Sequence, residues 1–492
     1  MKWTPLITSL VLIAAVAPAV PAAAASTIGA AGLSGTGTIG AAGVSGTGTI
    51  AWRACGTEPG AECGTVAVPM DWAKPDGPAI SLNVTRRKAT GERIGVLFYN
   101  PGGPGTGAAD LVRDWAPQFF SPELRERFDV VGIDPRGVGG SGQLQCGKAV
   151  HDPSVTQFPA TRAEYDRLVA HNQAVGESCG PMIQYVDTGS VARDFDAVRA
   201  ALGEERVSYL GRSYGSMLGT EYARRFPGRV RAMALDGVVD HGMSSREMVR
   251  DAASAVEDAF ERFAGWCERT TECALHGRPV AQVWDALVRG AEKTPIPVAG
   301  GRPLTAEELR YSAYAMLTIA PDFYGGLARG IIEAERGDAV TFGQIRAEAL
   351  DNPATTSAYR AILCQDIKPE ISGFLELRAR ARDIARRAPH MRGTSEFWDM
   401  TTGCVGWPAS PANPQRPVRI TKAPPVLLVG NTHDPATPLA WAESLAKGIK
   451  GSRVLTSDGD GHTAYLRNAC ATASIDRYLV SGTLPAPGTV CR

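Results

Sequence analysis

Residues 206–215 read RVSYLGRSYG, a short apolar run followed directly by a G-x-S-x-G pentapeptide centred on Ser213. Glycines two positions before and after a serine let the chain turn sharply from a strand into a helix, which exposes the serine hydroxyl. Residues 217–226 then have helical spacing and stop before Pro227-Gly228. The stretch therefore predicts a strand, a tight turn and a helix, with Ser213 as a candidate nucleophile. The alternative is a chance match in a chain with 55 glycines, and partner groups elsewhere must decide.

Further short apolar runs on either side of this stretch predict a sheet with helices between its strands. They cover residues 65–69, 80–85, 94–99, 128–134, 230–237, 424–430 and 452–456. The first two are joined through the turn sequence KPDG and are expected to pair antiparallel. A helical pattern at about 190–202 precedes the strand that leads to Ser213. Strands that alternate with helices indicate an α/β fold with a mostly parallel, doubly wound sheet.

The alternation stops after the sixth predicted strand. Residues 242–417 are mostly helical, and the strand pattern resumes only at 424–430. We therefore expect a core in two parts, 51–241 and 418–492, with a large helical cap of residues 242–417 inserted between them. Open α/β sheets bind their ligands beyond the carboxyl ends of the strands, so a cap placed there would shape the access of substrate.

The first 50 residues differ in composition from the rest of the chain. Residues 7–20 form a short apolar core and run into a small-residue segment, which is typical of a secretory signal peptide over 1–25. The apolar stretch is too short to span a membrane. Residues 27–37 and 38–48 are near-identical Gly/Ala/Ser/Thr-rich repeats, so 26–50 is predicted to be a flexible linker or a pro-segment. We expect a secreted protein with no membrane attachment after the signal is cleaved.

The ten cysteines predict disulfides, because an even number is expected in an oxidising compartment. We predict that neighbours along the chain pair: Cys55 with Cys63, Cys146 with Cys179, Cys267 with Cys273, Cys364 with Cys404, and Cys470 with Cys491. No C-x-x-C pair occurs among them, so we expect no zinc, and no cofactor is predicted. Basic and acidic residues balance at 51 each, so no net charge favours nucleic acid or an anionic membrane as a partner.

The acid and the base for Ser213 are expected in the part of the core that follows the cap. In α/β-hydrolases the catalytic triad comes in the chain order Ser, Asp or Glu, His. Asp434 stands just beyond the predicted strand 424–430, and His462 stands in a Gly-His loop after the last predicted strand. In this arrangement His462 takes the proton from Ser213 as the serine attacks a carbonyl carbon, and Asp434 holds the imidazole in the required tautomer.

Other residues near these positions are weaker candidates. His433 is the second histidine of the returning core, but it precedes the acid and is interpreted as its loop neighbour. Asp458 and Asp460 lie in a glycine-rich loop and are interpreted as turn formers. Residues 137–142 match G-x-G-x-x-G, but no helix-forming run opens on them, so we do not expect a dinucleotide site.

The negative oxygen formed during attack on a carbonyl needs backbone N–H donors. One is expected from Tyr214, directly after the nucleophile. The second is expected from the turn NPGGPG at residues 100–105, where glycines let backbone donors approach the substrate, and we choose Gly103. Such an oxyanion hole completes a four-part site for acyl transfer, and a chance match at Ser213 does not explain the other three parts.

These motifs together resemble the secreted tripeptidyl aminopeptidases, a branch of the prolyl-aminopeptidase-type α/β-hydrolases. The resemblance rests on NPGGPG at 100–105, DPRGVGGS at 134–141, the pentapeptide around Ser213, DPATP at 434–438 and Gly461-His462. It extends from about Trp52 to the C-terminus and implies a serine exopeptidase that removes tripeptides from free N-termini. The triad it implies is the same as that derived above. Pro101 departs from the histidine usual in prolyl aminopeptidases, but a backbone donor does not depend on that side chain.

An aminopeptidase must also bind a protonated amine, which calls for a carboxylate in the cap. Asp366 is the first candidate, because the predicted disulfide of Cys364 would hold it rigidly, and Glu247 is the second. A secreted esterase or lactonase is the alternative function, since a triad and an oxyanion hole serve any acyl transfer. A non-catalytic binding protein is a third possibility, which the complete order of Ser, Asp and His disfavours.

Overall fold

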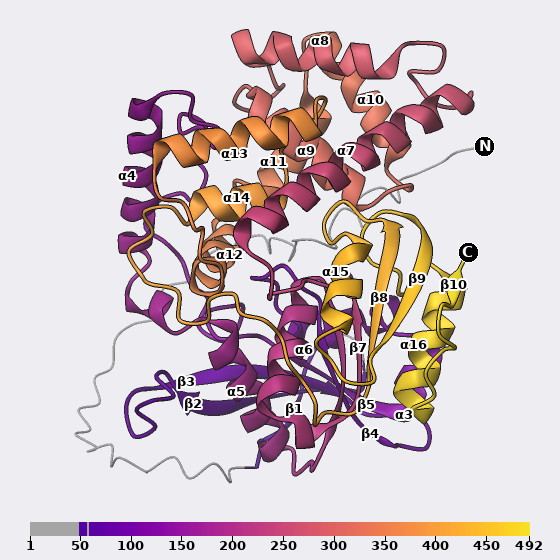
Figure 1. Cartoon of the computed structure of the whole chain (residues 1–492). Helices are drawn as coiled ribbons and strands as arrows, with labels where there is room; N and C mark the ends of the chain where they lie inside the picture. The colour runs from indigo at the N-terminus through magenta and orange to yellow at the C-terminus, as the bar shows by residue number, and fades with distance from the viewer. Residues whose placement is uncertain (1–48, 57–58) are drawn as a thin grey trace, which may run out of the picture.

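The computed structural model describes residues 49–56 and 59–492, so the predicted signal peptide and nearly all of the repeat segment lie outside it. This part of the chain folds around a ten-stranded sheet in the order β1-β2-β3-β5-β4-β6-β7-β8-β9-β10 (Figure 1). The strands are β1 (Arg53–Ala54), β2 (Ala61–Pro69), β3 (Ala79–Arg87), β4 (Gly95–Asn100), β5 (Phe128–Ile133), β6 (Val207–Arg212), β7 (Val230–Asp236), β8 (Val426–His433), β9 (Arg453–Asp460) and β10 (Val490–Cys491).

The sheet is antiparallel at one edge and parallel elsewhere. Strands β1, β2, β3 and β5 pair antiparallel in that order. From β5 through β4, β6, β7, β8 and β9 to β10 every pairing is parallel. Every residue of β4, β5 and β6 is buried, as expected of parallel strands that helices cover on both faces. The predicted α/β-hydrolase sheet is therefore present.

Alternate residues of the central strands face two different apolar layers. On β4, Phe98 packs in one cluster with Tyr209 of β6, while Leu97 and Tyr99 pack in another with Leu210. This is the period of two that places successive side chains on opposite faces of a sheet. The covering helices are α1 (Ala109–Asp114), α2 (Ala116–Phe119), α3 (Pro122–Arg127), α4 (Arg162–Ser178), α5 (Thr188–Ala201), α6 (Tyr214–Arg225), α15 (Leu439–Ala446) and α16 (Ala469–Ser481), with short 3-10 turns at Pro181–Gln184 and Pro227–Arg229.

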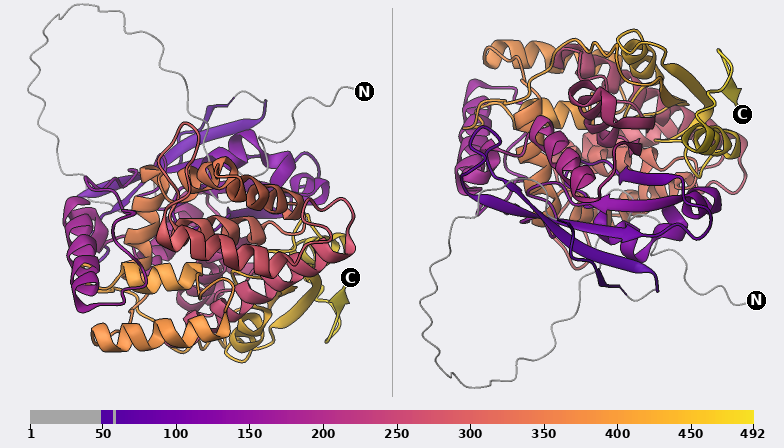
Figure 2. Two further views of the ribbon diagram at one scale, coloured as in Figure 1. Left: turned by 90° about the horizontal axis from the view of Figure 1, so that it is seen from above. Right: turned by 90° about the horizontal axis from the view of Figure 1, so that it is seen from below.

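Helices α7 to α14 occupy the chain between β7 and β8 and lie over one end of the sheet (Figures 1 and 2). They are α7 (Ser245–Arg269), α8 (Val280–Lys293), α9 (Ala306–Thr318), α10 (Tyr324–Glu335), α11 (Val340–Ala349), α12 (Pro353–Asp366), α13 (Phe374–Arg387) and α14 (Glu396–Gly403). We call them the cap helices. Phe260, Trp284, Leu309 and Phe342 belong to a separate apolar cluster, so α7 to α11 have a core of their own. Ile362 and Trp398 belong to the cluster of the sheet, which joins α12 and α14 to the core.

The cap helices follow the seventh strand of the structure, whereas the sequence predicted that they follow the sixth. The difference is β1, a two-residue strand that pairs with β2 beside the Cys55–Cys63 disulfide. Two residues carry no periodic pattern, so such a strand leaves no signal in the sequence. The start of α7 has a clear local cause. The Ser244 side chain accepts from the backbone N–H of Glu247, and the Glu247 carboxylate accepts from the backbone of Ser244, which is a capping box.

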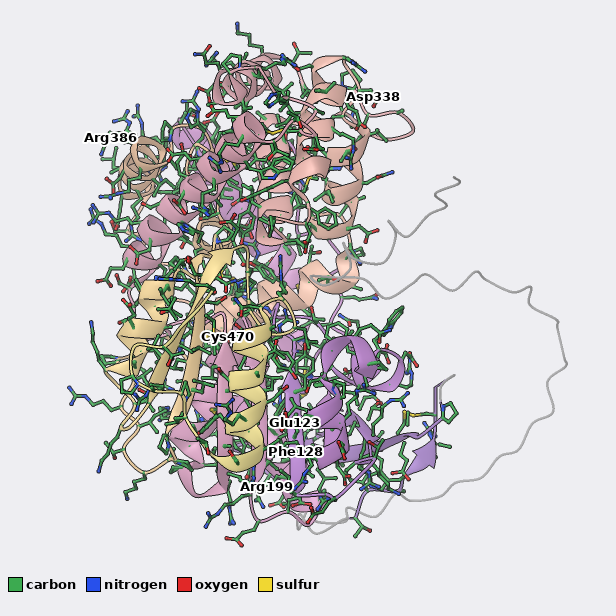
Figure 3. All side chains as sticks on the ribbon, turned by 90° about the vertical axis from the view of Figure 1, so that its right-hand side faces the viewer. Glu123, Phe128, Arg199, Asp338, Arg386 and Cys470 are labelled. Atoms are coloured by element: carbon green, nitrogen blue, oxygen red, sulfur yellow. A yellow bond between two sulfur atoms is a disulfide. The ribbon has the colours of Figure 1, made fainter. Side chains whose placement is uncertain are left out.

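Five disulfides link the described residues. They join Cys55 to Cys63, Cys146 to Cys179, Cys267 to Cys273, Cys364 to Cys404, and Cys470 to Cys491, the same neighbour pairing that the sequence suggested. The last one fastens the C-terminal strand β10 to the first turn of α16, where Cys470 is labelled in Figure 3. Across residues 49–56 and 59–492, none of the helices has the length and apolar character needed to cross a membrane.

Candidate active site

Ser213 occupies a strained turn between β6 and α6. Its φ of 55° and ψ of −126° lie in a region that L-residues rarely adopt, and such strain is characteristic of functional sites. The turn is fixed at its start, because the backbone N–H of Ser213 donates to the carbonyl oxygen of Asp236 on β7 at 2.9 Å. The strand, turn and helix predicted around Ser213 are thus present.

The glycines that flank Ser213 are required by close backbone approaches as well as by the turn. A Cβ added to Gly211 would lie 2.4 Å from the carbonyl oxygen of Gly215. A Cβ on Gly215 would lie 2.6 Å from the carbonyl oxygen of Asn100, at the end of the neighbouring strand β4. Both distances are shorter than real Cβ contacts. The first turn of α6 therefore packs directly onto the ends of β6 and β4.

Asp434 and His462 meet at the carboxyl ends of the parallel strands β8 and β9. His462 Nδ1 lies 2.8 Å from Oδ2 and 3.0 Å from Oδ1 of Asp434, which is 1% exposed. The same carboxylate accepts from the backbone N–H groups of Ala436 and Thr437 and from the Thr437 hydroxyl at 2.8 to 2.9 Å. These donors hold the carboxylate against the imidazole, which fixes the ring so that Nδ1 carries the hydrogen and Nε2 faces away.

The charges around His462 favour its protonated form. Burial lowers the pKa of the imidazole, but the carboxylates of Asp434, Glu396 and Asp236 outweigh it, so the pKa lies above its usual range. His462 Nε2 has no hydrogen-bond partner within the described part of the chain. It belongs to the same cavity lining as Ser213. An imidazole so placed can accept a proton from a serine hydroxyl.

The glycine turn after β4 packs directly against the nucleophile. A Cβ on Gly102 would lie 2.8 Å from Cβ of Ser213 and 3.4 Å from the backbone nitrogen of Tyr214. Gly103 and Tyr214 both line the small pocket beside Ser213. The two predicted oxyanion donors therefore border the space where the carbonyl oxygen of a substrate would lie. The Tyr214 side chain is anchored away from that space, because its hydroxyl hydrogen-bonds to the Thr188 hydroxyl at 2.6 Å.

A cavity of about 210 Å³ opens at Ser213 and His462, between the core and the cap helices. Apart from His151 and His462, the acidic and basic side chains of its lining come from the cap helices. Arg360 is neutralised by Asp399, whose carboxylate accepts from the guanidinium at 2.9 Å. Glu396 and Glu348 also line the cavity, and neither forms a salt bridge with a described residue. The cavity therefore presents two carboxylates that form no salt bridge with a described residue, of which Glu396 lies near the His462 imidazole.

Glu396 is the more strongly organised of these two carboxylates. It is the first residue of α14, and it accepts from the hydroxyls of Tyr359 at 2.9 Å and Tyr314 at 3.2 Å. Burial raises its pKa, while the tyrosine hydrogen bonds and the nearby His462 lower it, and the net direction is upward. Glu348 lies near the end of α11 and is exposed. Nothing in the sequence singles out Glu396, because an acidic residue in the first turn of a helix is commonly explained by its favourable interaction with the helix dipole.

The structure does not bring the two predicted amine-binding carboxylates to the cavity. Asp366 is 0% exposed, and its carboxylate accepts from the Thr188 backbone and hydroxyl and from the Asn413 amide. Its side chain is held by these hydrogen bonds inside the protein, away from the cavity. Glu247 is exposed and bonded to Ser244 in the capping box of α7. Neither side chain lines the cavity, whereas Glu396 does.

The weaker candidates from the sequence are engaged elsewhere. His433 Nδ1 lies 2.7 Å from Oδ2 of Asp258 on α7. Asp460 pairs with Arg262 of α7 and accepts from the Tyr324 hydroxyl of α10. Asp458 is exposed and accepts from Thr432. The contacts of His433 and Asp460 join the ends of β8 and β9 to the cap helices, and none of these three residues lines the cavity.

One cluster at the cavity rim has the residue types of a metal site. The ligand atoms of His151, Glu308 and Asp351 lie within 4.8 Å of one another. The guanidinium of Arg302 contacts the carboxylates of Glu308 at 2.5 Å and Asp351 at 2.9 Å. A cation therefore already bridges the two acids, and the cluster is an ion-pair network that joins α9 to the turn before α12.

Known proteins with similar sequences identify the family of this chain. The model of the family described as TAP-like protein matches residues 390–491, which contain both Asp434 and His462. The chain is 34% identical over 461 residues to a tripeptidyl aminopeptidase of Streptomyces coelicolor, covering 87% of this chain and 83% of the relative. The chain belongs to the tripeptidyl aminopeptidase family of α/β-hydrolases.

Other members of the family carry different names. The serine protease Hip1 of Mycobacterium tuberculosis is 34% identical over 462 residues, covering 88% of this chain and 87% of the relative. A carboxylesterase B of the same organism is 31% identical over 454 residues, with 88% and 86% covered. Relatives of similar identity are thus named for peptide hydrolysis and for ester hydrolysis, so membership of the family identifies a hydrolase but not its substrate.

Proposed function

We propose that this protein is a secreted serine exopeptidase that hydrolyses peptides near their free N-termini and releases tripeptides. Ser213 Oγ attacks the carbonyl carbon of the scissile bond while His462 Nε2 takes its proton, and Asp434 stabilises the resulting imidazolium. The backbone N–H groups of Tyr214 and Gly103 stabilise the negative oxygen of the tetrahedral intermediate.

The intermediate then collapses in the usual two halves of acyl transfer. The carbon–nitrogen bond breaks, and His462 gives its proton to the departing amine, which leaves the N-terminal fragment as an ester on Ser213. A water molecule, deprotonated by His462, attacks this ester and releases the fragment with a free carboxylate. Both halves use the same hydrogen bond between Asp434 Oδ2 and His462 Nδ1, at 2.8 Å.

The observation that carries the peptidase proposal is the charge of the cavity. Arg360 is paired with Asp399, whereas neither Glu396 nor Glu348 forms a salt bridge with a described residue. Such a lining favours a substrate with a positive group and disfavours one with a free carboxylate. A peptide with a free N-terminus has an ammonium group at the required end, and we propose that Glu396 binds it.

The released length and the location are proposed on other grounds. Two relatives with 34% identity are named tripeptidyl aminopeptidases, which supports release of three residues. Secretion is supported by the predicted signal peptide and by five disulfides, which persist in oxidising compartments. The esterase alternative is kept because of the relative named carboxylesterase B.

A substrate panel separates these functions. Purified protein is given mono-, di- and tripeptidyl anilides and a set of simple esters, and the released fragments are identified by mass spectrometry. The proposal predicts that the tripeptidyl anilide is cleaved fastest and yields an intact tripeptide. Turnover of esters without any anilide cleavage would refute the peptidase function, and rapid release of single residues would refute the tripeptide length.

A further inference from the structure

The last residue of β7 and the glycine that follows it contact all three segments that carry the proposed triad. We call these two residues, Asp236 and Gly237, the β7 corner. Both are buried, and neither lines the catalytic cavity or the small pocket beside Ser213. The corner therefore lies outside the space where a substrate binds, and any effect it has on the reaction must act through the residues that it holds.

The backbone of the β7 corner fixes the chain at the nucleophile and on the strand that leads to the acid. Strand β7 lies between β6 and β8 in the sheet (Figure 1). The carbonyl oxygen of Asp236 accepts from the backbone N–H of Ser213 at 2.9 Å. The backbone N–H of Gly237 donates to the carbonyl oxygen of Val429 on β8 at 3.0 Å, five residues before Asp434. Two neighbouring backbone groups thus join the ends of β6 and β8 across β7.

The Asp236 side chain holds the loop that carries the base. Its carboxylate accepts from the backbone N–H of Tyr465 at 2.8 Å and from that of Ala464 at 2.9 and 3.0 Å. These two residues closely follow His462 in the chain. The carboxylate is 0% exposed, and hydrogen bonds to a charged acceptor inside a protein are stronger than those in water. One side chain thus fixes the backbone directly after the base.

Two further contacts bring the base and the nucleophile together here. A Cβ added to Gly237 would lie 2.7 Å from Cε1 of His462, so the imidazole packs directly on the bare backbone of this glycine. Arg212, the residue before the nucleophile, donates to the hydroxyl of Thr463, the residue after the base. His462 Nε2 itself forms no hydrogen bond with a described residue. The distance between Ser213 and the imidazole is therefore set by their supports, and the β7 corner is a support that they share.

We infer that Asp236 is a positioning residue for catalysis, which holds the nucleophile turn and the base loop so that His462 can take the proton from Ser213. Gly237 contributes by leaving room for the imidazole. This inference rests on the triad of the proposed function and adds to it two residues that do not touch the substrate. A misplacement of about 1 Å can cost about 100-fold in rate, so loss of this support should lower kcat more than it changes KM.

Asp236→Asn tests the role of the carboxylate. One oxygen of the amide can still accept from the loop, but its NH2 group then meets the N–H of Ala464, so the loop loses part of its support. We expect kcat for a tripeptidyl anilide and for a p-nitrophenyl ester to fall by about 10- to 100-fold, with KM changed by less than about threefold. Both substrates should be affected, because the corner acts on the triad and not on the acyl group.

Asp194→Asn is the matched control for the loss of a buried carboxylate. Asp194 is also 0% exposed, and it pairs with Arg136, which like Asp194 does not line the cavity. Its substitution should lower the midpoint of urea unfolding, because a buried charge loses its partner, and leave kcat per active site unchanged. A fall of kcat in Asp236→Asn that is no larger than that in Asp194→Asn would overturn the inference.

Gly237→Ala tests the same corner while keeping the carboxylate, and it decides the question if Asp236→Asn yields no competent enzyme. The added methyl group would press on the imidazole, at a residue with a φ of +70°. We expect the same fall of kcat with little change in KM. Gly406→Ala is the control, because Gly406 has a φ of +83° and its Cβ would lie 2.8 Å from Val169. If kcat in Gly237→Ala is then no lower than in Gly406→Ala, the inference fails.

A fluorophosphonate that labels activated serines counts the competent sites, so every rate is expressed per active site. Its rate of reaction should fall together with kcat in Asp236→Asn, because labelling needs the same activated serine. Peptide mapping of the wild type should place the label on Ser213, and label elsewhere would overturn the proposed triad and the inference together. Label on Ser213 with equal kcat in variants and controls would overturn the inference alone. Turnover of the ester without the anilide would refute the peptidase function, and the ester would still test the β7 corner.

Discussion

The Tyr359 hydroxyl donates to Oε1 of Glu396 at 2.9 Å, which joins α12 to the first residue of α14. Tyr314 of α9 donates to the other carboxylate oxygen at 3.2 Å. Three cap helices therefore fix one carboxylate at the wall of the catalytic cavity before any substrate arrives. Preorganisation of this kind reduces the cost of ordering the carboxylate when an ammonium group binds.

Glu396→Gln should weaken the enzyme selectively toward substrates with a free amine. We expect kcat/KM for a tripeptidyl anilide to fall by about 10- to 100-fold, since a hydrogen bond between charged groups is lost. The N-acetylated substrate should be affected much less. Glu348→Gln is the matched control, because it removes the other unpaired carboxylate of the cavity. A selective loss in Glu348→Gln instead of Glu396→Gln would show that the amine binds at Glu348.

Much of this site could be predicted from the sequence, because the relevant signals are local. The turn at Ser213 needs glycines at 211 and 215, because the helix packs closely on the strand ends there. Asp434 and His462 each follow a strand that an apolar run of the sequence identifies. Each of the five disulfides joins one cysteine to the next cysteine along the chain, so the simplest pairing was the correct one.

The proposed role of Glu396 could not be predicted, because the direction of a side chain on a cap helix depends on packing between helices. Asp366 and Glu396 both lie on helices that contact the core, at the end of α12 and the start of α14. Asp366 faces Thr188 and Asn413, whereas Glu396 faces two tyrosines from other helices. Sequence spacing does not specify this difference, since it arises from how α9, α12 and α14 pack together.

The pH dependence of kcat/KM should depend on Glu396, because the negative charge of Glu396 raises the pKa of the catalytic base His462. Burial lowers the pKa of His462, but Asp434, Glu396 and Asp236 raise it above its usual range. The base must be neutral to act, so activity falls as the pH drops through this raised pKa. Removing the negative charge of Glu396 lowers the pKa of His462, and the acid limb of Glu396→Gln should move to lower pH. A shift to higher pH, or none, would mean that the two groups are not coupled in the free enzyme.

Asp434→Asn tests the role of the hydrogen bond to the imidazole. The amide can donate to Nδ1 and thereby stabilise the wrong tautomer, so we expect kcat to fall by about 10⁴-fold. Unfolding in urea provides the control, since the midpoint should change little compared with this loss of activity. A variant that retains more than a tenth of the wild-type kcat would contradict the assignment of Asp434.

Asp366→Ala should affect stability and leave amine selectivity unchanged. It leaves the buried donors of Thr188 and Asn413 without their acceptor, which we expect to lower the free energy of unfolding by about 2 to 4 kcal/mol. Urea unfolding measures this loss, and the rates with free and N-acetylated tripeptidyl anilides measure the selectivity. A reduced preference for the free amine in a fully folded Asp366→Ala protein would restore the original assignment of Asp366 to the amine site.

The most direct test of the central claim is the ratio of kcat/KM for one tripeptidyl anilide with a free amine to that for its N-acetylated form, measured in the wild-type enzyme. The unpaired carboxylates of the cavity predict a ratio of at least about 100 in favour of the free amine, and no turnover of either substrate above background in Ser213→Ala. A ratio near one, or cleavage that survives in Ser213→Ala, would contradict a serine exopeptidase that recognises the N-terminus of its substrate.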